Sequence, residues 1–279
     1  MNHITTEIAE LAGIFAADGC MQKDYICLWG NISEDREYYD MVIKRLFNVA
    51  FGIDVRPHEK RSNSVYGFYV CKRDILNFFT QHLGFHAGSK TNTVCVPPSI
   101  LQSRDRQIWA AFVRGVADGD GCLTFDKRYG TSKKVRKIVH NYPRIQIRSV
   151  AYELINGTSM LLDKLGIIHF VILTKNHKPN EQDSYLLQVS GVERLHQWMK
   201  VVGFSNPAKL TKYCLFNRYG FVPPNTTISQ RKAMLDNELS PVDFYPSEFH
   251  QEISEFAHSH NIYNQTNAQP SLGPVAQLG

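Results

Sequence analysis

The chain contains one sequence pattern twice. The stretch "LAGIFAADG" at 11–19 returns as "VRGVADGDG" at 113–121, and the later landmarks follow in the same order. The spacing between equivalent residues grows from 102 for Asp18 and Asp120 to 119 for Gly84 and Gly203. Such extra residues belong in turns, where longer loops are tolerated. The repeat therefore constrains the fold to two similar units.

Each copy predicts the element order α-β-β-α-β-β-α. After the first motif, strands are expected at 25–32, 53–60 and 65–71, and helices at 33–52 and 73–85. After the second, strands are expected at 122–127, 144–150, 168–175 and 184–190, and helices at 151–166 and 192–204. Because the strands are apolar on alternate residues, we predict an α+β fold with two pseudo-symmetric antiparallel sheets, each open on one face.

Three segments follow from this pattern. We assign 1–98 to the first repeat and 99–224 to the second, which ends at "GFVPPNTT". Residues 225–279 form a C-terminal extension with one predicted helix and a disordered tail, since the final stretch is polar and rich in Pro and Gly.

Composition is that of a soluble globular protein. Of the 279 residues, 43% are hydrophobic and 20% charged, and neither a leader peptide nor a membrane span is evident. We expect a cytoplasmic or organellar, DNA-containing compartment rather than secretion. The six cysteines never form C-x-x-C, so they predict neither a zinc site nor a disulfide framework, and we expect reduced, buried side chains.

One segment concentrates positive charge. The stretch 127–148 has no Asp or Glu, and its basic residues are Lys127, Arg128, Lys133, Lys134, Arg136, Lys137, Arg144 and Arg148. Such a strip suits phosphate contacts, and the polar side chains within it suit contacts with base edges. A solvated basic hairpin is the alternative.

Small residues recur at helical spacing within both motifs. Gly13 and Ala17 lie four apart, as do Gly115 and Gly119. Small residues at this spacing let two helices approach until their backbones touch, so we expect the motif helices to pack together.

That packing would place Asp18 and Asp120 side by side. Paired carboxylates repel unless a cation lies between them, and Mg²⁺ prefers such oxygen ligands. The alternative for each acid is a turn residue after a helix. Asp118 has Ala16 as its counterpart in the first motif, so a symmetric catalytic role for that position is not expected.

The two motifs resemble those of the LAGLIDADG homing endonucleases in their monomeric, two-repeat form, over residues 6–218. The resemblance implies saddle-shaped sheets in the major groove of a long asymmetric DNA site. It implies a site-specific double-strand endonuclease that uses Mg²⁺ or another divalent cation such as Mn²⁺. An RNA maturase acting on intron RNA and a nuclease-dead DNA-binding protein on the same scaffold are the alternatives.

The resemblance also assigns residues. Asp18 and Asp120 would bind metal with the carbonyl groups of Ala17 and Gly119. Basic residues near the scissile phosphate would be Lys90 and Lys209, with Lys212 as an alternative, and Asn31 and Gln146 are candidates to orient water.

DNA contacts should come from alternate strand residues, where Arg reads guanine, Asn and Gln read adenine, and Lys holds phosphates. A slip of one residue would reverse which set faces DNA. Besides the basic strip, the candidates are Tyr25, Trp29, Asn31, Arg56, His58, Lys60, Arg61 and Tyr66 in the first repeat, and Arg144, Gln146, Arg148, Lys175 and Gln188 in the second.

Overall fold

A computed structural model describes residues 3–60, 64–88, 93–128, 135–175 and 182–266 of the protein. Several residues singled out from the sequence lie outside this part, namely Arg61, Lys90, Lys133, Lys134, the side chain of Arg136 and the tail at 267–279. Within the described ranges, no helix combines the length and the apolar character needed to cross a membrane.

The first repeat builds a four-stranded sheet behind the helix α1 (Thr6–Asp18). Its strands pair antiparallel in the order β1-β2-β4-β3, with bounds β1 (Gly19–Met21), β2 (Ile26–Asn31), β3 (His58–Lys60) and β4 (Val65–Val70). The helical segments are a π-helical stretch at Tyr38–Ile43 (η1), α2 (Lys44–Phe51) and α3 (Arg73–Gln81). Gly52 ends α2 with φ +64°, a left-handed conformation that favours glycine.

The second repeat has the same strand order, β5-β6-β8-β7, again antiparallel. The strands are β5 (Gly121–Lys127), β6 (His140–Ser149), β7 (Phe170–Thr174) and β8 (Ser184–Ser190). The helices up to the end of the repeat are α4 (Pro98–Leu101), α5 (Arg106–Gly119), α6 (Val135–Ile138), α7 (Tyr152–Leu165), α8 (Val192–Val201) and α9 (Pro207–Tyr219). Asp105 caps α5, because its side chain accepts a hydrogen bond from the Gln107 N–H.

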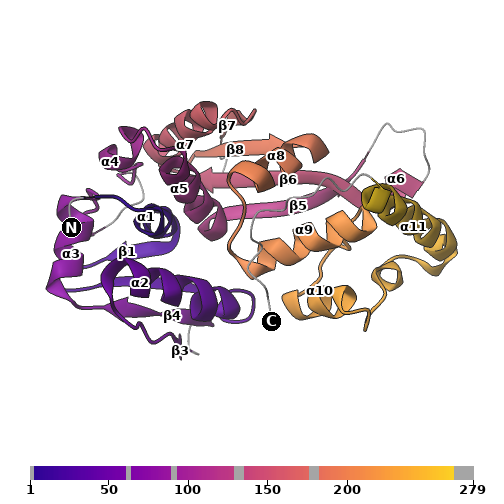
Figure 1. Ribbon diagram of the computed structural model, residues 1–279, viewed down its shortest axis with the longest axis horizontal. Helices are drawn as coiled ribbons and strands as arrows, with labels where there is room; N and C mark the ends of the chain where they lie inside the picture. The colour runs from indigo at the N-terminus through magenta and orange to yellow at the C-terminus, as the bar shows by residue number, and fades with distance from the viewer. Residues whose placement is uncertain (1–2, 61–63, 89–92, 129–134, 176–181, 267–279) are drawn as a thin grey trace.

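The hydrophobic core joins the two repeats. In Figure 1, α1 and α5 lie next to each other between the first sheet at lower left and the second sheet above it. One face of each sheet supplies buried apolar side chains, such as Leu28 and Phe68 in the first and Ile145 and Leu187 in the second. Phe47 of α2 packs on Phe68, and α7 and α8 contact β6 and β8. The predicted α+β fold with two similar repeats is confirmed.

The C-terminal extension is more structured than predicted. It contains α10 (Ile228–Leu235), two 3₁₀ turns at Pro241–Phe244 and Ser247–Phe249, and α11 (His250–Thr266), where one helix was expected. Phe221, Tyr245 and Ile253 form a small apolar cluster with Val139, which precedes β6. The extension therefore packs on the second repeat.

Candidate functional site at the ends of the paired motif helices

The motif helices α1 and α5 touch through their backbones. A Cβ atom added to Gly13 would lie 2.2 Å from the Phe112 carbonyl oxygen of α5. One added to Gly115 would lie 2.1 Å from the Glu10 carbonyl oxygen of α1. Neither distance leaves room for a methyl group, so the close packing predicted from the small residues is confirmed.

This packing brings the ends of the two helices together. Asp18 is the last residue of α1, and Asp120 directly follows α5; both are exposed, and β1 and β5 begin at the next residues. A Cβ atom on Gly119 would lie 2.8 Å from Asp18 Oδ2 and 2.6 Å from the Ala17 Cβ. The Asp18 carboxylate thus lies against the residue that precedes Asp120.

The donors at this place suit a hard divalent cation. They are carboxylate and backbone carbonyl oxygens, the ligands that Mg²⁺ and Mn²⁺ accept. Among the described residues, no group of three or more His, Cys, Asp or Glu side chains could hold a metal by itself. Mg²⁺ in proteins is commonly held by one or two carboxylates together with waters and substrate phosphates.

Lys209 lies close to these acids. It sits in the first turn of α9, whose N-cap Asn206 accepts a hydrogen bond from the Ala208 N–H at 2.9 Å. Its Nζ donates to the Asp118 carbonyl oxygen, and only 8% of the residue is exposed. Burial lowers the pKa of Lys209, while the charges of Asp118, Asp35 and Asp18 act in the opposite direction.

The alternative lysine points elsewhere. Lys212 Nζ donates to the Leu123 carbonyl oxygen at 3.1 Å, and burial lowers the pKa of its amine as well. Of the two lysines, Lys209 is the one whose pKa is influenced by Asp18.

The two aspartates of "ADGDG" have different environments. Asp118 is 2% exposed, whereas Asp120 is exposed. Asp118 Oδ2 accepts a hydrogen bond from the Ser205 N–H at 2.7 Å, and Oδ1 is buried without a hydrogen-bond partner. Burial raises the pKa of Asp118 to about 7, against the lowering effect of Lys209. Asp118 therefore holds the segment that leads into α9.

A buried ion pair, which was not predicted from the sequence, supports this arrangement. Arg114 Nη2 donates to Glu10 Oε2 at 2.7 Å, and Arg114 Nη1 donates to the Val202 carbonyl oxygen at 2.9 Å. Ser205 Oγ donates to Glu10 Oε1 at 2.7 Å. Glu10 is 4% exposed within the apolar α1, and a charged residue at that position was the signal available in the sequence.

The open face of the first sheet is rich in aromatic side chains. The rings of Trp29 and His58 lie 5.3 Å apart, His58 and Tyr69 6.0 Å apart, and Tyr69 and Tyr25 6.2 Å apart. Lys60 Nζ lies 5.9 Å from the Trp29 ring. Asn31 is exposed at the end of β2, and its side chain accepts bonds from the N–H groups of the following turn. Tyr69, 58% exposed, was missed from the sequence.

Tyr66 is not on that face, so its predicted placement is wrong. In β4, the Tyr66 side chain projects to the side of the sheet opposite Gly67 and Tyr69. It is 6% exposed, packs against the helices, and donates a hydrogen bond to Asp40 Oδ1 at 2.6 Å. Arg56 is exposed in the loop before β3.

The open face of the second sheet carries polar side chains on β6 and β8, beside the exposed apolar Phe170 and Ile172 of β7. Gln146 Nε2 donates to Gln188 Oε1 at 2.7 Å across β6 and β8, and Arg148 Nη1 donates to Ser184 Oγ at 3.0 Å. Arg144 forms an ion pair of 2.9 Å with Asp126. The predicted set Arg144, Gln146, Arg148 and Gln188 therefore shares one face.

The described residues of the basic strip that precede β6 lie at one end of this sheet, whereas Lys175 lies at the opposite end. Lys127 is the last residue of β5, and the Arg128 guanidinium lies 6.0 Å from the Tyr142 ring. Lys137 is exposed on α6, and Lys175 is exposed directly after β7.

The C-terminal extension bridges the two repeats. Arg231 of α10 is 1% exposed; its Nη2 donates to Glu34 Oε2 of the first repeat at 2.8 Å, and its Nε donates to Thr211 Oγ1 of α9 at 3.0 Å. Lys232 adds a contact of 2.5 Å with Glu37. Glu34 and Arg231 thus fix α10 to both repeats.

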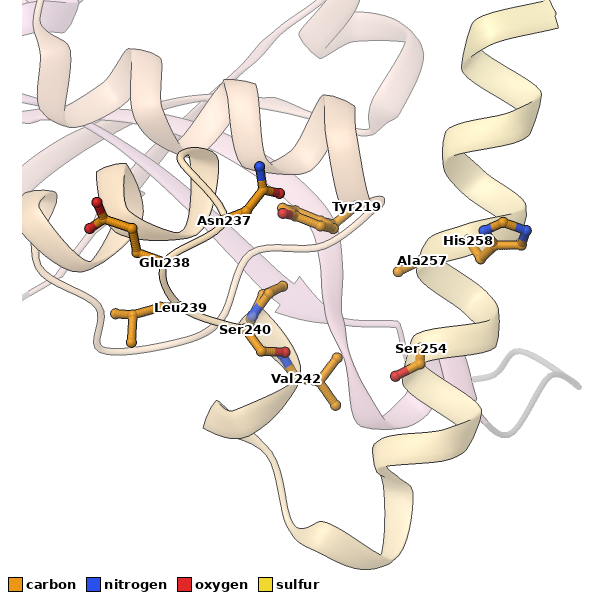
Figure 2. A pocket seen from close by; sticks show the side chains of 10 residues that line it. Tyr219, Asn237, Glu238, Leu239, Ser240, Val242, Ser254, Ala257 and His258 are labelled. Carbon is orange, nitrogen blue, oxygen red and sulfur yellow. The ribbon is translucent and has the colours of Figure 1, made fainter.

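A cavity of about 440 Å³ lies between the C-terminal extension and the end of α9 (Figure 2). Tyr219, Asn237, Ser240, Ser254 and His258 are among the residues that line it. It contains no residue of α1, α5 or the open sheet faces, so it is separate from the candidate site.

No protein-family model matches the chain. Over 76% of its length it is 24% identical to the ATP-dependent DNA helicase Hel308 of Thermococcus kodakarensis. Over 70% it is 24% identical to the probable translation initiation factor IF-2 of Methanocaldococcus jannaschii. The matches span 18% and 14% of these two relatives, so neither protein's activity is assigned to this chain.

Solved structures of a homing endonuclease and of a LAGLIDADG domain resemble this one. The homing endonuclease I-DmoI, in complex with DNA and Mn, is 14% identical over 71% of this chain and 96% of its own, with a TM-score of 0.47. The N-terminal LAGLIDADG domain of DUF199/WhiA is 14% identical over 71% of this chain and 81% of its own, with a TM-score of 0.42. That the chain is of the monomeric two-motif type stays a prediction.

Proposed function

We propose that the protein is a site-specific, double-strand DNA endonuclease that depends on a divalent cation. The observation that carries the proposal is the contact between α1 and α5, which sets the exposed Asp18 carboxylate against Gly119, next to Asp120. Both acids lie at the C-terminal ends of the motif helices and directly precede the first strands of the open sheets. Cleavage of two strands needs two such positions, and the duplicated motif supplies them.

The metal would be held by the carboxylates of Asp18 and Asp120 and the carbonyl groups of Ala17 and Gly119. A bound divalent cation supplies positive charge beside the scissile phosphate. Lys209, buried near Asp18, would add a second positive charge there, and its hydrogen bond to the Asp118 carbonyl keeps the amine in place. Lys90 is proposed for the equivalent role in the first repeat.

The open sheet faces would bind the DNA on either side of this centre. Arg144, Gln146, Arg148 and Gln188 carry donors suited to guanine and adenine edges. In the first repeat, Asn31, Lys60 and Arg56 are the polar candidates beside the aromatic cluster. Because the two open faces carry different side chains, a single chain would recognise two different half-sites, which favours a long asymmetric target bound by a monomer.

The test is cleavage of a randomised double-stranded DNA library in Mg²⁺ or Mn²⁺ by the native chain, Asp18→Asn and Asp120→Asn. Asp54→Asn is the matched control, because Asp54 is an exposed acid that pairs with Lys44 of α2. We expect the native chain and the control to cut one long site, and each motif variant to lose cleavage or to nick one strand. Cleavage by both motif variants at the level of the native chain would exclude this assignment.

DNA binding without cleavage is the second candidate. The tight burial of Lys209 favours it, because an amine bound to a backbone carbonyl has fewer donors for phosphate. In that case the library would be bound at one sequence without metal and left intact. Tight binding to a structured intron RNA, but not to DNA, would instead indicate the maturase.

A further inference from the structure

Two cysteines face each other on the open face of the first sheet. Cys20 of β1 and Cys27 of β2 are direct cross-strand partners. Directly opposite residues of antiparallel strands have Cα atoms about 4.5 to 5.5 Å apart and project to the same side. That spacing lies within the Cα separation of about 4.4 to 6.8 Å that a disulfide requires.

The side chains also interact. Burial and the neighbouring Cys20 raise the pKa of the Cys27 thiol. Cys20 is partly exposed, whereas Cys27 is 8% exposed. A reagent in solution would therefore meet Cys20 first, with Cys27 behind it.

The second repeat lacks this pair and so provides an internal control. Cys122 follows Gly121 as Cys20 follows Gly19, but its partner across β6 is Gln146. Cys122 is exposed, as are Cys71, Cys95 and Cys214, which corrects the expectation that the cysteines are buried. Of the described strand pairings, Cys20 with Cys27 is the one that joins two cysteines.

We propose that Cys20 and Cys27 form a reversible disulfide, which makes the first sheet a site of thiol–disulfide exchange. The oxidant is a low-molecular-weight disulfide such as oxidised glutathione. The Cys20 thiolate attacks one of its sulfur atoms and releases one glutathione thiol, which leaves a mixed disulfide on Cys20. The Cys27 thiolate then attacks the Cys20 sulfur and releases the second glutathione thiol. The two cysteines lose two protons and two electrons, and the oxidant is reduced to two thiols.

The position gives this modification a consequence for the open face. Cys20 is two residues beyond Asp18, and Cys27 lies between Cys20 and Tyr69 in the cross-strand row. A disulfide would join β1 covalently to β2 next to the aromatic cluster. The inference does not depend on the proposed nuclease activity.

The experiment uses the full, reduced chain and a series of buffers with rising ratios of oxidised to reduced glutathione. Remaining thiols are alkylated, and the chain is digested with trypsin, which cuts after Lys23 and Arg36. Peptides 1–23 and 24–36 each contain one of the two cysteines. We expect these two peptides to appear joined, with the loss of two hydrogens, and to separate again on reduction.

Three cysteine variants test which residues form the disulfide. Cys122→Ser should leave the joined peptides unchanged, whereas Cys20→Ser and Cys27→Ser should each abolish them. Cys20→Ser changes a partly exposed residue, so it tests the pairing even if Cys27→Ser unfolds the chain. If Cys20 instead stops at the glutathione adduct at every ratio, or joins only to cysteines of another chain, the proposal is wrong.

Discussion

Gly13→Ala tests the contact between the motif helices. Its new methyl carbon would lie 2.2 Å from the Phe112 carbonyl oxygen, where an ordinary carbon–oxygen contact is about 3.3 Å. The helices would have to separate by about 1 Å, since a backbone carbonyl cannot rotate away as a side chain can. Overpacking of a core costs up to about 3 kcal/mol. Alanine regains about 1 kcal/mol of helix propensity, so the expected net loss is about 2 kcal/mol.

The assay is equilibrium unfolding in urea, followed by circular dichroism. Gly115→Ala should cost a similar amount, because its methyl carbon would meet the Glu10 carbonyl oxygen at 2.1 Å. The double variant should cost less than the sum, since separation of the helices at one glycine makes room at the other. Gly166→Ala is the control: it has open space but φ +76°, and should cost about 1 kcal/mol. A gain of about 1 kcal/mol in both single variants, as on an exposed helix, would refute the packing argument.

Two further predictions concern buried charges. With its pKa raised to about 7, Asp118 keeps its proton to higher pH in the folded than in the unfolded chain, so the stability it contributes is present at pH 4 and lost as pH rises through 7. Asp118→Asn should reduce this fall in the free energy of unfolding by at most about 4 kcal/mol between pH 4 and 8. The measurement is urea unfolding at a series of pH values, and a free energy of unfolding that falls with pH as steeply as in the native chain would contradict the prediction. Arg231→Met should destabilise the chain by about 2 kcal/mol, because it breaks an ion pair whose Glu34 side chain is 36% exposed. Lys232→Met, at a more exposed pair, should change stability by less than about 1 kcal/mol, and equal effects of the two would argue against the bridging role of Arg231.

The parts of the fold that the sequence predicts are those with a local signature. Gly13 and Gly115 mark a helix crossing because no other residue fits there. The strand β6 alternates strictly between partly exposed and buried residues over 140–147, and Gln188 of β8 lies opposite Gln146, so the two glutamines share a face as expected. Repetition of the order of elements then sets the sheet topology of both halves.

The parts that the sequence does not predict depend on contacts between distant segments. Tyr66 is of a residue type that is expected to face the DNA groove, but the register of β4 directs its side chain toward Asp40. Tyr69, three residues later, takes the open face. From the sequence alone, Arg231 is expected to be a surface residue of an exposed helix. In the structure it contacts Glu34 of the first repeat and Thr211 of the second. No local sequence pattern predicts these contacts between distant segments.

One departure from symmetry, Ala16 in the first motif and Asp118 in the second, has a structural origin. Ala16, the counterpart of Asp118, is 1% exposed and apolar, which suits a helix that only packs against its neighbours. The equivalent turn of α5 must also receive the chain as it enters α9. There, the Ser205 N–H bonds to the Asp118 side chain, and Asn206 and Lys209 bond to its carbonyl. The second motif therefore needs an acid at this position for a structural reason, which the first motif, with Ala16, does not share. The fold thus accounts for the acid that differs between the copies, whereas Asp18 and Asp120, which both copies share, are the acids to which the proposed function assigns the metal.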